Sequence, residues 1–183
     1  MKKILPLLLA ALCLLTGCSS KYSGLFEKLR TDTADSTALS FNADIRAEYD
    51  DRTERFSLAC TRSAGETCVT VTRPESIAGV RARCADGGLK LEYGAVSMDL
   101  GVTDEKTGLT PAAAPAILTD AIINGFLTAC GRDGDTVLCS VAYNDDISVQ
   151  LWLSGTEGVP VRAEIVSGGR VTVFCDISDW KTE

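Results

Sequence analysis

The residues best able to do chemistry in this chain are its cysteines, because histidine is absent. The sequence contains eight cysteines and no histidine. That absence removes the commonest general base, the usual zinc ligand, and every serine–histidine or cysteine–histidine nucleophile. The glycine-rich segments have turn spacing and lack a phosphate-binding pattern. We therefore expect a protein that is not an enzyme, with no catalytic residue, no metal and no cofactor.

One cysteine, Cys18, closes the longest apolar run of the chain. Two lysines precede a run from Ile4 to Leu15 that is apolar apart from one proline. A positive start followed by an apolar run of this length is typical of a signal peptide, and the run is too short for a permanent membrane-spanning helix. The alternative interpretation is an ordinary secretory signal, or an unprocessed anchor, in which the cysteine has no role.

The four residues Leu15-Thr16-Gly17-Cys18 resemble the lipobox of bacterial lipoproteins. In that family a signal peptidase cuts before the cysteine and the thiol carries a diacylglycerol, so the resemblance implies lipid attachment at Cys18. Two or more acyl chains hold a protein durably to a membrane, whereas one chain does so only marginally. We therefore expect residues 1–17 to be cleaved, residues 18–21 to form a lipidated tether, and residues 22–183 to form a single domain on the extracytoplasmic face of the cell membrane.

The charge of the chain narrows its partners. It has 18 basic and 25 acidic residues, and cleavage would remove two lysines, which takes the formal net charge from −7 to −9. An acidic body disfavours nucleic acid as a partner and disfavours adsorption on anionic lipid headgroups. The expected partners are the membrane, through the N-terminal lipid, and either an acyl chain or other apolar ligand or a protein of the cell envelope.

Six further cysteines follow the lipobox. An even number in an exported chain predicts disulfides, although six cysteines allow 15 pairings. The alternative is that they stay unpaired and act as small buried hydrophobic residues. The six are Cys60, Cys68, Cys84, Cys130, Cys139 and Cys175.

Turn chemistry predicts two of these pairs. A three-residue loop at 63–65, with glycine at its last position, would set Cys60 directly opposite Cys68 across a hairpin. A two-residue Gly-Asp turn midway between Cys130 and Cys139 would set those two opposite each other as well. The two remaining cysteines are then either a long-range pair or free thiols.

The hydrophobic period predicts one short helix followed by a long series of strands. Leu25, Phe26 and Leu29 fall on one helical face, which ends near residues 31–36. From residue 39 to 49 apolar and polar residues alternate, as in a half-buried strand. Turn residues then bound further strands at 56–61, 68–72, 80–85, 89–93 and 96–100.

A second helix interrupts this series. After a loop at 103–115, residues 116–129 have a wide apolar arc, which predicts a helix packed on the sheet or plugging its open side. Because the strand connections are short, neighbouring strands must be antiparallel. The fold class is therefore α+β, with one meander sheet curled into a half-barrel. The later strands are expected at 136–143, 147–153, 161–166 and 171–177.

This order of elements behind a lipobox resembles the lipoprotein-carrier (LolA/LolB-like) superfamily, across about residues 22–180. The Pro-Glu-x-x-Ala-Gly segment within residues 72–80 also resembles a segment of Gram-positive lipoproteins of this type. The resemblance implies an incomplete barrel whose concave side, closed by helices, holds acyl chains in an apolar cavity.

Alternation places a set of apolar side chains on the concave face, where they are candidates to line such a cavity. A filled core requires the same residues, so two functions stay open: binding of a lipid or other apolar ligand, or a protein-interaction or sensor module with a filled core. The acidic pairs at 50–51 and 145–146 fit turn chemistry better than a calcium site. The cavity candidates are Phe41, Ile45, Tyr49, Leu91, Tyr93, Ile122, Phe126, Val149, Leu151 and Leu153.

Overall fold

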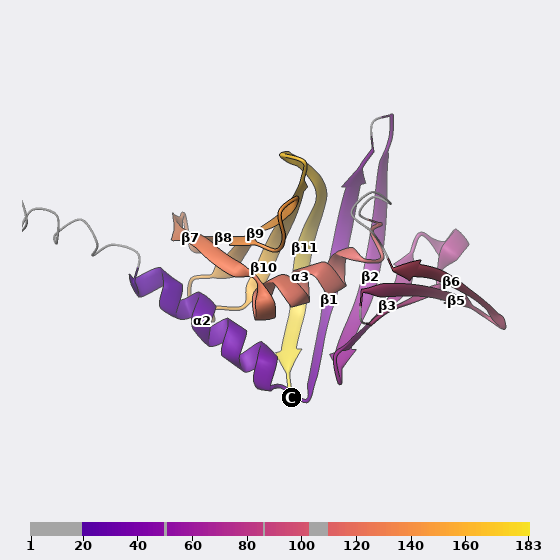
Figure 1. Cartoon of the computed structure of the whole chain (residues 1–183), viewed down its shortest axis with the longest axis horizontal. Coiled ribbons are helices and arrows are strands. Elements are labelled where there is room, and N and C mark those ends of the chain that lie inside the picture. Colours follow the sequence, from indigo (N-terminus) through magenta and orange to yellow (C-terminus); the bar gives the residue numbers. More distant parts are fainter. Residues whose placement is uncertain (1–19, 50, 86, 103–109) are drawn as a thin grey trace, which may run out of the picture.

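The computed structural model describes residues 20–49, 51–85, 87–102 and 110–183. The cleavage site and the lipid-attachment site predicted at Cys18 lie outside the described residues. Figure 1 shows a broad curled sheet with two helices lying along one of its faces.

The first helix, α2 (Ser20–Asp35), confirms the short amphipathic helix expected near its middle. Two of the three residues of its apolar face are buried, Phe26 at 0% and Leu29 at 4% exposure, and Leu25 is half-buried. The helix starts at Ser20, five residues before Leu25, the first apolar residue of the predicted helical face. The added first turn is mostly polar, so the apolar pattern does not reveal it.

The strands follow in two series separated by the second helix, α3 (Ala114–Asn124). The first series is β1 (Ala38–Glu48), β2 (Thr53–Ser63), β3 (Glu66–Arg73), the single-turn 3₁₀ helix η2 (Glu75–Ile77), β4 (Arg81–Ala85), β5 (Gly88–Tyr93) and β6 (Val96–Val102). The second series is β7 (Phe126–Asp133), β8 (Thr136–Ala142), β9 (Ile147–Ser154), β10 (Pro160–Ser167) and β11 (Arg170–Thr182).

All eleven strands form one antiparallel sheet in the order β6-β5-β4-β3-β2-β1-β11-β10-β9-β8-β7. The chain begins in the middle of the sheet, runs out to one edge at β6, crosses to the opposite edge at β7, and returns until β11 pairs with β1. The prediction of an open meander interrupted by a helix is therefore confirmed. The helix sits in the crossing connection, so the topology itself draws it over one face of the sheet (Figure 1).

The second helix is shorter than predicted, because residues 126–129 belong to strand β7. The helix ends at Gly125, whose backbone is extended with φ −70° and ψ 159°. A side chain there would come within 2.5 Å of both the Ala121 carbonyl oxygen and Val141 Cγ1. The chain therefore turns sharply at this glycine and pairs with β8, a long-range contact that the local apolar pattern does not contain.

The disulfide predictions are half right. Cys130 lies directly opposite Cys139 and the two sulfur atoms are bonded at 2.19 Å, as the two-residue turn predicts. The pairing of Cys60 with Cys68 is wrong. That hairpin has a two-residue turn, in which Ala64 and Gly65 both adopt positive φ, so Cys60 faces Val69.

This one-residue change of register puts the two cysteines on opposite faces of the sheet. Cys60 is buried in the core, whereas Cys68 is half-buried on the other face. Cys84 and Cys175 are also free thiols and do not form the long-range pair that was one of the two alternatives.

Candidate functional site

The concave face of the sheet is the candidate site, and α3 is the element that occupies it. Leu118 and Ile122 of α3 are each 1% exposed and belong to one apolar cluster with the inward residues of the sheet. Pro115 stands at the start of the helix, where its missing N–H costs nothing. Phe26 of α2 fills the same cluster from the side, so protein side chains occupy the middle of the concave face.

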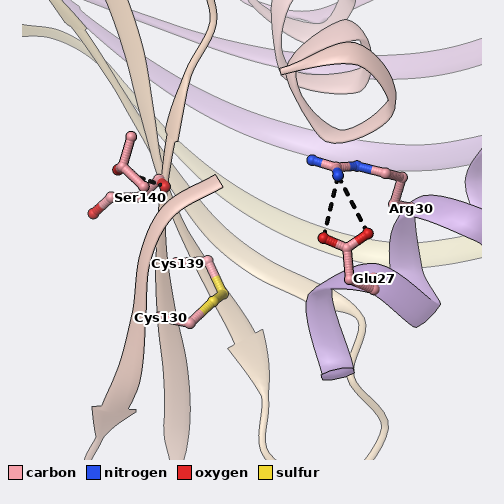
Figure 2. The surroundings of a disulfide bond; sticks show 6 residues. Glu27, Arg30, Cys130, Cys139 and Ser140 are labelled. Carbon is pink, nitrogen blue, oxygen red and sulfur yellow. Dashed lines mark hydrogen bonds and ion pairs between the residues drawn. A yellow bond between two sulfur atoms is a disulfide. The ribbon is translucent and has the colours of Figure 1, made fainter. Parts of the chain in front are cut away.

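One arginine joins the two helices. Arg30 of α2 donates from Nε to the Ile122 carbonyl at 2.9 Å and from Nη2 to the Gly125 carbonyl at 2.7 Å. These acceptors lie in the last turn of α3 and beyond it, where helix carbonyls lack partners and the helix dipole favours a positive charge. Figure 2 shows Glu27 holding the same guanidinium in an ion pair of 3.2 Å.

An ion pair holds α3 to the other half of the sheet. Arg62 of β2 lies 3.4 Å from the Asp120 carboxylate, and the arginine side chain is only 17% exposed. Together, the Arg30 and Arg62 contacts tie the helix to both sides of the face that it covers. Neither contact is visible in the hydrophobic pattern, because each joins residues more than fifty positions apart in the sequence.

Six of the ten cavity candidates lie together in the core. None of the six is more than 2% exposed, and each packs within the same apolar cluster that the two helices complete. Their apolar character, taken alone, is therefore explained by the filled core. The six are Phe41, Ile45, Ile122, Val149, Leu151 and Leu153.

The other four candidates lie elsewhere. Tyr49 is 39% exposed just beyond the end of β1, and Phe126, expected on a helix, is 74% exposed on β7. Leu91 is half-buried and Tyr93 is 56% exposed, both on β5. The structure thus buries six of the ten candidates and leaves four partly or largely exposed. Of these four, Leu91 and Tyr93 on β5 have apolar neighbours.

The β5–β6 hairpin carries an open apolar surface. Leu91 lies directly opposite Met98, and Tyr93 directly opposite Val96, on the face that begins with the buried Leu89. The exposed fractions are 68% for Val96, 56% for Met98 and 44% for Leu100. We call Leu91, Tyr93, Val96, Met98 and Leu100 the hairpin patch.

Sequence reasoning found only two members of the hairpin patch. The alternation of Val96, Met98 and Leu100 was visible and predicted a strand, but not a strand at the end of a sheet beyond the reach of a helix. The patch is continuous with the core through Leu89 and Leu91, so it extends the concave face outward.

A small cavity lies between α3 and strands β2 to β5, with Leu89 in its lining. Its volume is about 80 Å³, well below the roughly 300 Å³ at which ligand pockets begin. Burial, with Asp120 nearby, raises the pKa of the Cys84 thiol to about 11 and also raises the pKa of the Tyr143 hydroxyl. Both groups are therefore neutral at physiological pH, and Cys84 is not a reactive thiolate.

Comparison with known proteins supports the fold and goes no further in identifying the chain. No protein-family profile matches the sequence, and no curated protein matches it. A LolA-superfamily protein from Nitrosomonas europaea superposes with a TM-score of 0.50 at 16% identity, covering 88% of this chain and 93% of that one. The likeness of fold rests on the comparison with this Nitrosomonas europaea protein.

Two other solved structures have a lower TM-score. A putative outer membrane lipoprotein-sorting protein domain from Vibrio parahaemolyticus has a TM-score of 0.49 at 8% identity and covers 86% of this chain and 91% of that one. The structure of the CwlD amidase from Clostridioides difficile in complex with the GerS lipoprotein contains a chain with a TM-score of 0.41 at 10% identity, with 90% and 94% covered.

Within residues 20–49, 51–85, 87–102 and 110–183, no helix combines the length and the apolar character that crossing a bilayer requires.

Proposed function

We propose that this protein is an extracytoplasmic lipoprotein, anchored through a lipid on Cys18, whose single domain at residues 22–183 binds an apolar ligand such as an acyl chain. Two observations support the general class: the lipobox-like sequence at the N-terminus and the fold shared with a LolA-superfamily protein. The role proposed is binding and not catalysis.

The hairpin patch is the observation that carries this proposal. A soluble monomer seldom leaves a contiguous group of large apolar side chains open to water unless the group binds something. Complete burial of one such side chain contributes about 1.5–3 kcal/mol, so covering the half-exposed residues of the patch would stabilise a complex appreciably. Because Phe26 and Leu118 fill the middle of the concave face, the ligand is expected to lie along the hairpin and against Leu89.

A second candidate function, binding of a cell-envelope protein, has an observation of its own. Among the described residues β6 is the last strand at its end of the sheet, so no described strand pairs with the backbone groups on its outer side. An extended segment of a partner can add to such an edge, with alternate side chains of the partner lying on the apolar face. The hairpin patch would then be the floor of a protein interface.

Titration with pyrene-labelled palmitate distinguishes the two functions. The mature chain with Cys18→Ser, which carries no attached lipid, is compared with versions that also contain Val96→Lys or Met98→Lys. For a ligand site, each lysine should weaken binding about tenfold or more, because a charge must be desolvated against the apolar chain. Val161→Lys is the matched control, since Val161 is 37% exposed on the distant strand β10.

Each outcome of the palmitate titration points to a different function. Absence of palmitate binding to the parent protein, together with loss of a captured envelope protein in Val96→Lys, would replace the first candidate with the second. Equal binding by parent and both patch variants would remove the hairpin patch from either function. The anchor is tested independently, because Cys18→Ser should move the full-length protein from the membrane fraction to the soluble fraction.

A further inference from the structure

The face of the sheet turned away from the two helices has a groove of its own. Its volume is about 880 Å³, and it lies over β1, β2, β10 and β11, with the residues before η2 at one side. Side chains of both charges line it, including Asp44, Arg46, Arg55, Arg73, Arg162 and Asp176. Of the cavity candidates, only Ile45 is among the lining residues of this groove. Its side chain points to the opposite face and is buried there.

The register of the central strands sets like charges directly opposite each other in this groove. Arg46 on β1 faces Arg55 on β2, and Asp44 on β1 faces Asp176 on β11. Asp176 also has Arg162 of β10 directly opposite on its other side. Like charges in directly opposed positions destabilise an antiparallel sheet. The groove therefore contains a positive pair and, two residues away along β1, a negative pair.

Three of these four side chains have no ion-pair partner of their own. Among the described residues, Arg55, Asp44 and Asp176 form no ion pair, although Asp44 accepts a hydrogen bond from Ser57 Oγ at 2.5 Å. Arg46 is the exception. Its guanidinium lies 3.9 Å over the ring of Phe174, and its Nε is 3.4 Å from a Glu48 carboxylate oxygen.

Charge complementarity and spacing identify the kind of ligand that would satisfy both pairs. The lining carries four arginines and three carboxylates, so a ligand with charges of only one sign would be repelled by one of the two sets. Two residues along a strand correspond to about 6.7 Å, and an extended chain spans about 3.3–3.6 Å per residue, so the charged ends of a dipeptide match the distance between the pairs. Arginine also binds carboxylates in a bidentate manner.

We propose that this groove binds a dipeptide-sized zwitterion, with its carboxylate at Arg46 and Arg55 and its ammonium group at Asp44 and Asp176. Phe174, which lies directly opposite Arg46 on β11 with its ring under the guanidinium, supplies an apolar floor for the peptide side chains. The site is on the opposite face of the sheet from the hairpin patch and does not depend on the function proposed there.

Calorimetric titration of the mature chain with free Ala-Ala, N-acetyl-Ala-Ala and Ala-Ala amide tests the proposal. Free Ala-Ala should bind at least about tenfold more tightly than either capped form, because each cap removes one charge-assisted contact. Arg55→Gln should abolish the preference for Ala-Ala over its amide and keep the preference over the acetylated form. Asp176→Asn should abolish the preference for Ala-Ala over its acetylated form and keep the preference over the amide.

Matched variants outside the groove serve as controls. Arg81→Gln and Asp145→Asn remove an exposed charge of each sign from elsewhere on the surface and should leave all three affinities unchanged. Arg55→Gln relieves a like-charge pair and should not lower the midpoint of thermal unfolding. Asp176→Asn relieves the repulsion from Asp44 but also removes the charge opposite Arg162, so the midpoint should change little. A lowered midpoint in both would show that the pairs are structural and overturn the proposal.

Two binding results would also overturn it. The first is equal or absent binding of the free and capped peptides at about 10 mM, a concentration that saturates a site of millimolar affinity. The second is tighter binding of phosphoethanolamine than of Ala-Ala with loss in the same two variants, which would assign the groove to a zwitterionic lipid headgroup and not to a peptide.

Discussion

The two ends of the concave face differ in burial, although their strands have the same alternating pattern. On β8 to β10 the inward side chains are sealed, and Val141, Leu151 and Ile165 are at most 1% exposed. On β5 and β6 the inward side chains beyond Leu89 are open, and Val96 is 68% exposed. Alternation therefore marks a face that can be buried, while a covering element decides whether it is buried.

Dimensions explain why the cover is incomplete. Eleven strands at about 4.8 Å make a sheet about 48 Å wide, whereas the 16 residues of α2 and the 11 residues of α3 extend about 24 Å and 16 Å. Helix α2 lies over the β7 side, and α3 lies over the centre of the sheet, where Arg30 holds it on one side and Arg62 of β2 on the other (Figure 1). The β5–β6 end is left to contact water or a ligand.

The sharpest test of this comparison is one truncation in each region. Leu151→Ala should lower the free energy of unfolding by about 2–5 kcal/mol, because it removes buried methyl groups and leaves a cavity. Met98→Ala, at 56% exposure, should change it by no more than about 0.5 kcal/mol. Urea denaturation of both variants measures the difference, and equal losses would mean that the hairpin belongs to the core.

The disulfide should have the next largest effect, and it lies in the packed region. Cys130 and Cys139 are nine residues apart, and closing a loop of that size in the unfolded chain contributes about 2–3 kcal/mol by the chain-entropy estimate. The double variant Cys130→Ala/Cys139→Ala should lose that amount in urea denaturation. A reducing agent should destabilise the parent similarly and leave the double variant unchanged; destabilisation of both would point to another cause.

Removing the arginine that joins the helices should have an effect of similar or smaller size. Arg30→Gln loses charge-assisted hydrogen bonds to the Ile122 and Gly125 carbonyls, which should cost about 1.5–3 kcal/mol. The exposed Arg81→Gln is the control, with an expected change within about 0.5 kcal/mol. If Arg30→Gln behaves like the control in denaturation, packing alone holds α3 in place.

The buried thiols should produce the smallest effect, visible only in alkali. Burial, with Asp176 nearby, raises the pKa of Cys175 from 9.0 to about 12, and burial raises the pKa of Cys60 further still. The unfolded chain loses these protons first, so the stabilisation is complete below pH 9 and is lost as pH rises toward 12. Cys175→Ala should remove about 1 kcal/mol of the decrease in unfolding free energy between pH 9 and 10.

Val161→Ala, which removes no titrating group, is the control for that measurement, since Val161 is exposed on β10. It should leave the slope of stability against pH equal to that of the parent protein. Equal slopes in all three proteins would show that deprotonation of Cys175 does not differ between the folded and unfolded chains.

Local patterns predicted most of the fold and part of the candidate site. The alternation from residue 39 onward identified the strands, and the Gly-Asp turn identified the bonded cysteines, because these signals depend on neighbours in sequence. The turn at Ala64-Gly65 was misjudged by one residue, and the end of α3 by five. Both errors have the same cause, since cross-strand pairing selected one of two local conformations that the sequence permits.

By itself the sequence determined the lipobox-like start, the absence of histidine chemistry, and the division of each strand into an apolar and a polar face. Tertiary structure decided which part of the apolar face is sealed by helices and which part is the open hairpin patch. It also decided the meeting of Arg46 with Arg55 and of Asp44 with Asp176. Such contacts depend on the register between paired strands, and no period within a single strand encodes that register.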